Sequence, residues 1–196
     1  MRDFADDLLR LLDRLSVKSA HVVGLSLGGG IAFQLAVEAP QRLRSLVIVN
    51  SGPELIARTL AERIAIWQRY AVIHLLGLRK MGQLIAGKLF PHDAALRRTF
   101  VERFAANDKQ CYLSALRAFV GWSVADRLGE ITCPTLVVAA DQDYSPVEIK
   151  EAYVARLSNA RLAVIEDARH ALPMEKPDVF NRCLLEFLQQ QRARAA

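Results

Sequence analysis

The chain has 196 residues, a length that suits one domain with a sizeable core or one domain with a small insertion. Hydrophobic residues make up 52% of the chain and charged residues 24%, as in ordinary globular proteins, and no apolar run approaches the roughly 18 residues that a membrane span needs. The net charge is +5 without any basic run of five or more residues, which argues against a nucleic-acid partner.

The first elements along the chain predict a compact βαβ unit. Residues 2–15 carry apolar side chains at helical spacing and predict an amphipathic helix. Residues 21–26 predict a strand buried on both faces, and residues 28–39 predict a buried helix that Pro40 ends. Residues 43–49 predict a second apolar strand, so the two strands are joined by a right-handed crossover.

The pattern changes after the second strand, because residues 53–125 contain no strand-like run. Helical segments are expected near residues 54–76, 78–89, 93–106 and 108–120, with breaks at Gly77, Gly87, residues 91–93 and Gly121. Residues 53–127 hold twelve Arg and Lys against six Asp and Glu, a local charge of +6. Two interpretations stay open: a solvated helical surface, or electrostatic attraction of an anionic substrate.

Strand and helix alternate again after Pro134. Residues 135–140 and 161–165 predict two more strands, and residues 146–157 and 178–190 predict the helices that follow them. The alternation predicts an α/β fold with a parallel sheet of about four strands, flanked by helices.

The first residues and the cysteines indicate the cellular compartment and whether a metal site is expected. The first residues are charged and acidic, unlike a secretory signal. Cys111, Cys133 and Cys183 are widely spaced and form no C-x-x-C pair. We therefore expect reduced thiols, a cytoplasmic location, and neither a metal site nor a disulfide framework.

The most informative stretch, residues 24–29, reads G-L-S-L-G-G between the first strand and its helix. In this context the G-x-S-x-G spacing holds Ser26 on a strained turn with its hydroxyl exposed. We expect that side chains at Gly24 or Gly28 would collide with the neighbouring strand or helix. The N–H of Leu27 would then point to a developing oxyanion. The alternative is an ordinary glycine-rich turn whose serine only caps the helix.

A serine nucleophile needs a base and an acid that orients the base. In parallel sheets such groups lie at the carboxyl ends of strands. The loop after the third strand carries Asp141 and Asp143, and the loop after the fourth carries His170. The other three histidines lie in the helical insertion or at the far end of a strand. His170 is therefore the candidate base, and either aspartate is a candidate acid, with Asp141 also placed to cap its turn.

On these residues the chain resembles the α/β-hydrolase fold superfamily, in the branch that uses a serine nucleophile. The resemblance is carried by residues 24–29, 141–146 and 169–170. It implies Asp143 as the acid, three residues after the last small residue of the strand, in preference to Asp141. A second family position for the acid is Asn50 here, and an amide cannot replace a carboxylate.

The resemblance also implies a division of the chain. Residues 1–52 and 126–196 correspond to a partial hydrolase core, and residues 53–125 to the helical cap that covers the site in such families. Complete members carry several strands and an oxyanion loop before the serine turn. We therefore expect this chain to hold the later half of the sheet, strands five to eight, without an assigned second oxyanion donor. We expect a shortened chain or a half-sheet protein that self-associates through the exposed edge of residues 21–26.

The function that the resemblance implies is hydrolysis of a small ester, lactone or thioester through an acyl-Ser26 intermediate. His170 would act as base and then acid, Asp143 as its orienting partner, and the Leu27 N–H as oxyanion donor. No metal or organic cofactor is implied. Two alternatives stay open: a carbon–carbon bond hydrolase with the same triad, and a catalytically weak remnant that acts as an interaction protein.

Overall fold

The computed structural model describes residues 1–195, with side chains up to residue 193. The chain divides into two compact units. The first, Met1–Glu54 with Ser123–Ala196, contains all four strands, and we call it the sheet unit. The second, Leu55–Trp122, contains no strand among its described residues, and we call it the helical unit. The cap assigned to residues 53–125 stays a prediction as regards its role.

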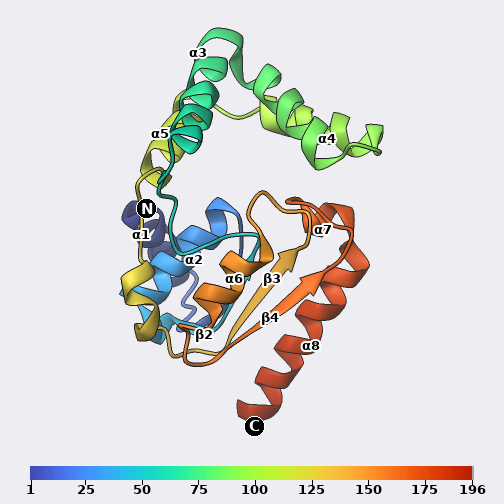
Figure 1. The fold of residues 1–196 in the computed structure, drawn as a ribbon. Coiled ribbons are helices and arrows are strands. Elements are labelled where there is room, and N and C mark those ends of the chain that lie inside the picture. The colour runs from blue at the N-terminus through green and yellow to red at the C-terminus, as the bar shows by residue number, and fades with distance from the viewer. Residues whose placement is uncertain (196) are drawn as a thin grey trace. The chain divides into compact units, whose positions relative to one another are not determined.

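The sheet unit contains four parallel strands in the order β1-β2-β3-β4 (Figure 1). Its strands are β1 Ala20–Leu25, β2 Leu43–Val49, β3 Thr135–Ala140 and β4 Ala160–Ile165. Its α-helices are α1 Arg2–Arg14, α2 Leu27–Glu38, α6 Val147–Val154, α7 Leu172–Glu175 and α8 Pro177–Ala195, with 3-10 turns at Pro40–Arg42 and Ala125–Glu130. The expected α/β architecture with a four-stranded parallel sheet is confirmed.

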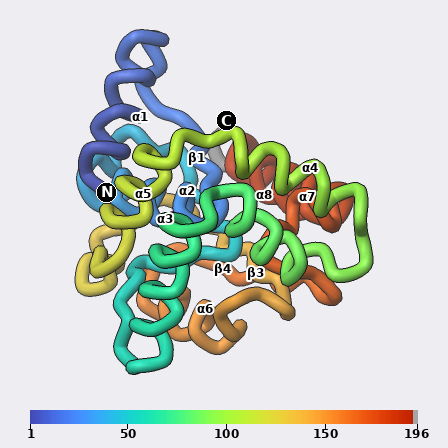
Figure 2. The backbone as a smooth tube through the Cα atoms, turned by 90° about the horizontal axis from the view of Figure 1, so that it is seen from above, coloured from blue at the N-terminus to red at the C-terminus, as the bar shows by residue number. Residues whose placement is uncertain are grey.

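Helices cover both faces of the sheet. On one face α2 and α6 lie side by side, and the rings of Phe33 and Tyr153 meet edge to face at 5.8 Å. On the other face Phe180 and Phe187 of α8 pack in the cluster that includes Leu136 of β3. Figures 1 and 2 show α8 beside β4 and α1 beside α2. This burial on both faces explains why β2 and β3 are continuous apolar runs.

Strand β1 differs from the expectation that it is buried on both faces. Within the described residues β1 pairs only with β2, so it forms an edge of the sheet. Val23 is 46% exposed and Leu25 is 38% exposed. Val23 pairs with Val47, so both side chains point to the face that α8 covers, but α8 packs against β4. The expectation of burial on both faces was therefore wrong for the α8 face of this strand.

The helical unit consists of α3 Leu60–Leu89, α4 Ala94–Ala105 and α5 Lys109–Phe119. Gly77 has φ 78° and interrupts α3, as the sequence predicts. Gly87 continues the helix, and that expected break was wrong, because glycine weakens a helix without ending it. The helix begins at residue 60 and not at 54, because Thr59 and Glu62 form a reciprocal capping box.

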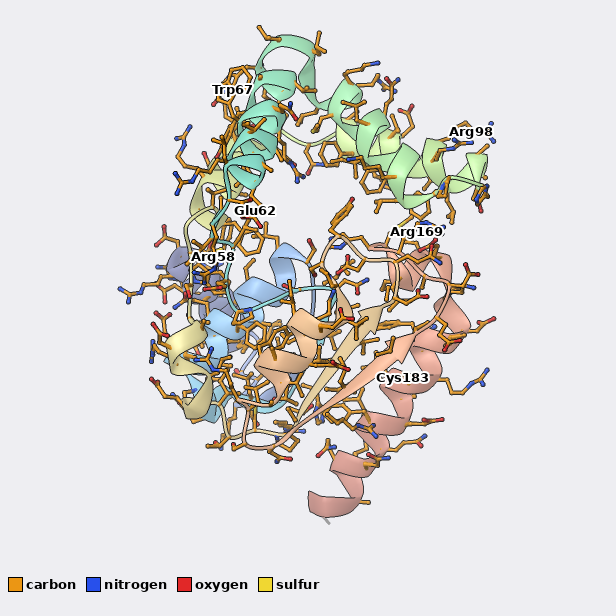
Figure 3. The ribbon with its side chains drawn as sticks, viewed as in Figure 1. Arg58, Glu62, Trp67, Arg98, Arg169 and Cys183 are labelled. Carbon is orange, nitrogen blue, oxygen red and sulfur yellow. The ribbon has the colours of Figure 1, made fainter. Side chains whose placement is uncertain are left out.

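The helical unit has a small core of its own. It is built from Ile73, Leu78, Met81 and Leu113. The ring of Phe104 packs against that of Tyr112 at 5.1 Å. Trp67, by contrast, is 69% exposed on α3 (Figure 3). Among the described residues, no helix is both long and apolar enough to cross a membrane.

The exposed edge of β1 generates a prediction about association. Unpaired backbone groups beside Val23 and Leu25 are a template for pairing with another chain. We expect the protein to self-associate, and Val23→Lys to reduce this association, because an edge lysine opposes strand pairing. Sedimentation velocity measures the change, and Leu185→Lys, on the exposed side of α8, is the matched control. A wild-type chain that stays monomeric across the concentration series would contradict the prediction.

Candidate active site

Ser26 lies where β1 turns directly into α2, and its backbone is unusual. Its φ of 54° and ψ of −120° fall in a region that costs a non-glycine residue about 1–3 kcal/mol. The turn is held by the Ser26 N–H, which donates to Val49 O at 3.0 Å, and by Ser51 Oγ, which donates to Ser26 O at 2.6 Å. The Leu27 N–H opens α2, where helical N–H groups have no partner within the helix and the dipole is positive.

The glycines of the turn differ in how much space surrounds the position of a Cβ atom. A Cβ added to Gly24 would lie 2.3 Å from Gly28 O, and one added to Gly29 would lie 2.5 Å from Ser51 Cβ. A Cβ added to Gly28 would meet nothing within 4 Å. The expected collision at Gly24 is therefore present, but the one expected at Gly28 was wrong. Gly29 is the second position where the close packing excludes a side chain.

Three predicted site residues meet at the carboxyl edge of the sheet. His170 Nε2 lies 2.8 Å from Ser26 Oγ, and His170 Nδ1 lies 2.6 Å from Asp143 Oδ1. A carboxylate accepts only, so the Nδ1–H donates to Asp143 and Nε2 is left to accept from the serine hydroxyl. The Tyr144 ring lies 4.4 Å from the imidazole. The structure thus brings Ser26, His170 and Asp143 into one line of hydrogen bonds.

Asp141 is not part of this line of hydrogen bonds. Its Oδ1 accepts from the Ala168 N–H at 3.1 Å, so it holds the loop that leads to His170 and does not contact the imidazole. Desolvation alone would raise the pKa of Asp141, but hydrogen bonds from backbone N–H groups, with Ala168 foremost, keep it below the ordinary value. Of the two aspartates that the sequence leaves open, the geometry associates only Asp143 with His170.

Asp143 has a second partner that sequence reasoning missed. Lys150 Nζ lies 2.7 Å from Asp143 Oδ2, and the two side chains are each only 1% exposed. Burial by itself raises the pKa of Asp143, but hydrogen bonds from His170 and Lys150, together with their charges, hold it below its ordinary value. The signal was available, since Lys150 lies three residues before the buried Tyr153 and so shares its side of α6.

Asn50 is the other residue whose role sequence reasoning missed. Its φ of 43° is left-handed, and its side chain is buried at the end of β2. The Asn50 amide oxygen accepts from the Ala140 N–H at 2.8 Å, and its nitrogen donates to the carbonyls of Arg169 and His170 at 3.1 Å each. Asn50 therefore ties the ends of β2 and β3 to the loop that carries the imidazole.

The same loop is anchored from its other side. The Arg169 N–H donates to Glu175 Oε2 at 2.6 Å, and the Arg169 guanidinium pairs with Glu175 Oε1 at 3.0 Å. Figure 3 labels Arg169 on the loop between β4 and α7. His170 is thus held in place by backbone and side-chain hydrogen bonds on both sides.

This geometry agrees with a family comparison, in which the alpha/beta hydrolase fold family matches residues 1–177. The chain belongs to the alpha/beta hydrolase fold family. It is 32% identical to the 2-hydroxy-6-oxo-6-phenylhexa-2,4-dienoate hydrolase of Comamonas testosteroni, over 92% of this chain and 66% of that protein. It is also 32% identical to RutD of Variovorax paradoxus, provisionally named a carbamate hydrolase, over 95% of this chain and 72% of that protein.

Solved structures give the same assignment. A hydrolase of Pseudomonas aeruginosa PA01 superposes with a TM-score of 0.83 at 28% identity, over 94% of this chain and 70% of that one. The chain spans between 66% and 76% of the length of the curated relatives compared. The relatives named here are hydrolases by name, which supports a hydrolase in this family.

The packing of the turn predicts an order among its glycines. Gly24→Ala and Gly29→Ala should each lower the free energy of unfolding by about 1–3 kcal/mol or more, because the added Cβ overlaps fixed atoms. Gly28→Ala should stay within about 0.5 kcal/mol of wild type or gain stability, since alanine favours the helix. Urea denaturation measures all three variants. A loss at Gly28→Ala as large as that at Gly24→Ala would contradict the packing described here.

Proposed function

We propose that the chain is a serine-type hydrolase that cleaves an ester, lactone or thioester bond through an acyl-Ser26 intermediate. The observation that carries the proposal is the line of hydrogen bonds from Asp143 through His170 to Ser26. Ser26 is an alcohol at the carboxyl edge of a parallel sheet, with a base and a buried carboxylate in the order that nucleophilic catalysis requires. The family membership and the hydrolase names of the relatives support the same reaction class.

The proposal assigns roles to three residues and one backbone N–H. His170 Nε2 takes the hydroxyl proton as Ser26 Oγ attacks the carbonyl carbon, and Asp143 stabilises the resulting imidazolium. The oxyanion develops beside the Leu27 N–H at the positive end of α2. The imidazolium then protonates the leaving group, and a water deprotonated by the same imidazole hydrolyses the acyl group and restores Ser26. The pKa of Asp143 lies below its ordinary value, so this carboxyl stays ionised throughout.

A carbon–carbon bond hydrolase is a second candidate, favoured by one observation. The relative from Comamonas testosteroni is named as a hydrolase of a dienoate, a substrate that carries a carboxylate. Residues 55–122 of this chain hold eleven Arg and Lys against four Asp and Glu. This charge supports an anionic substrate in either reaction, and a substrate-selecting role for the helical unit as the family's cap. The cytoplasmic location stays a prediction, as does the alternative of a weak, interacting remnant.

Covalent labelling tests the proposed nucleophile. A fluorophosphonate probe should label the wild-type chain, and Ser26→Ala and His170→Ala should each remove the labelling without unfolding the protein. Asp143→Asn should slow labelling far more than Asp141→Asn, because only Asp143 contacts the imidazole. In-gel fluorescence measures the rates, and circular dichroism checks folding. Equal rates for the two asparagine variants would overturn the choice of acid, and absence of labelling would favour the remnant.

The charge of the helical unit predicts a dependence on salt. For an ester substrate that carries a free carboxylate, kcat/KM should fall as the ionic strength rises, because salt screens long-range attraction. A neutral ester of the same size is the control and should show little change. Steady-state kinetics between low and high sodium chloride measure both substrates. The anionic-substrate proposal fails if the two profiles are equally flat.

A further inference from the structure

Lys150 places a buried ammonium against the side of Asp143 that faces away from the imidazole. Its Nζ lies 2.7 Å from Asp143 Oδ2, 2.6 Å from Ser145 O and 2.8 Å from Ser145 Oγ. An ammonium has three N–H donors, and these three acceptors use all of them. The Lys150 side chain is fixed at both ends, since its backbone belongs to α6 and its ammonium is bound by Asp143 and Ser145 of the loop after β3.

Each carboxylate oxygen of Asp143 therefore accepts from a different side chain. Oδ1 faces His170 Nδ1 at 2.6 Å, and Oδ2 faces Lys150 Nζ. Tyr153 of α6 is a further titratable group that the Asp143 charge affects, since burial and that charge raise the pKa of Tyr153, and its hydroxyl donates to Ser51 O. With a neutral imidazole the buried pair carries no net charge, because one ammonium balances one carboxylate.

A buried ion pair of this kind is a weak source of stability. Removing two charges from water costs nearly as much as their attraction returns, and an apolar replacement is often neutral. Asp143 of this pair also contacts His170, so Lys150 is placed to act on the orientation of the base rather than on stability.

We propose that Lys150 is a positioning residue, which holds Oδ2 of Asp143 and aims its Oδ1 at His170, and so governs how well His170 can activate Ser26. Its effect on Ser26 rests on the function proposed above. Its effect on Asp143 and His170 does not, because the contacts exist independently of any substrate.

The sign of the pH effect follows from the charges. Without the ammonium, the buried Asp143 carboxylate takes up a proton at higher pH, since nothing compensates its desolvation. A protonated Asp143 no longer offers an anionic acceptor to the His170 Nδ1–H. The acid-side loss of Ser26 reactivity therefore moves to higher pH.

The test is the pH dependence of fluorophosphonate labelling in Lys150→Met, which keeps an unbranched side chain one atom shorter than lysine and removes its charge. We expect the pH of half-maximal labelling on the acid side to rise by about one unit, and labelling below it to slow about tenfold. The matched control is Lys176→Met, because Lys176, which follows α7, pairs at 3.0 Å with Asp167 on the loop after β4 and does not contact Asp143. The control profile should stay at the wild-type position.

A double-mutant cycle separates positioning from general support. If Lys150 acts through Asp143, Lys150→Met should add less than about a twofold loss in the Asp143→Asn background. A merely structural lysine would cause the same further loss in both backgrounds, and that result would overturn the proposal.

A readout without activity separates this inference from the proposed function. The His170 Nδ1–H that donates to Asp143 should give a far-downfield proton resonance, and Lys150→Met should shift or remove it while Lys176→Met leaves it unchanged. Failure of wild-type labelling with this resonance behaving as expected would overturn only the proposed function. An unchanged resonance and an unchanged pH profile in folded Lys150→Met would overturn the inference.

Folding of the variant is checked by circular dichroism, since removing one partner of a buried pair destabilises a protein. If Lys150→Met does not fold, Lys150→Gln takes its place, because it is neutral yet keeps an N–H donor toward Asp143. The upward shift is expected there too, as the charge is lost. Failure of both variants to fold would assign Lys150 a structural role and overturn the proposal.

Discussion

The left-handed backbone of Ser26 is the constraint on which the rest of the site depends. It turns β1 into α2 within one residue, places the hydroxyl at the end of the strand within 2.8 Å of His170 Nε2, and places the Leu27 N–H at the first position of the helix. This conformation is costly, and the chain stabilises it with close packing at Gly24 and Gly29 and with hydrogen bonds to Val49 and Ser51. The elements around the turn therefore hold the Ser26 backbone in a conformation that is unfavourable for a non-glycine residue.

The partners of Ser26 are held by a second, electrostatic arrangement. Asn50 and Glu175 fix the loop of His170, and Lys150 fixes the carboxylate behind it. A buried carboxylate is costly without donors, and Asp143 has a donor at each oxygen. The imidazole tautomer follows from this, because Nδ1 must donate and Nε2 must accept. The backbone conformation of the turn positions Ser26, and the paired Asp143 carboxylate orients His170. Together they form the hydrogen bond between His170 and Ser26.

Much of this arrangement was predictable from local patterns. Apolar runs and proline positions indicated the four parallel strands, and the G-x-S-x-G turn and strand ends indicated Ser26, His170 and the two aspartates. Those signals depend on neighbours in the sequence. The roles of Lys150 and Asn50 depend on contacts between residues that are distant in the fold, so their residue types alone did not reveal them. The exposure of Val23 was not predicted, because an apolar strand has the same sequence pattern whether or not a helix covers it. The collision expected at Gly28 was wrong, because a glycine of the motif need not be closely packed.

Ser26 is the proposed carrier of the acyl group. The direct measurement is mass spectrometry of the protein quenched in acid during reaction with p-nitrophenyl acetate. The tryptic peptide of residues 19–42 contains Ser19 and Ser26 as its serines, and fragmentation distinguishes them. We expect an acetyl group on Ser26 in the wild type and its absence in Ser26→Ala. Ester turnover with the acetyl group on another side chain, such as Ser51 or Ser145, would contradict the proposed acyl-Ser26 intermediate.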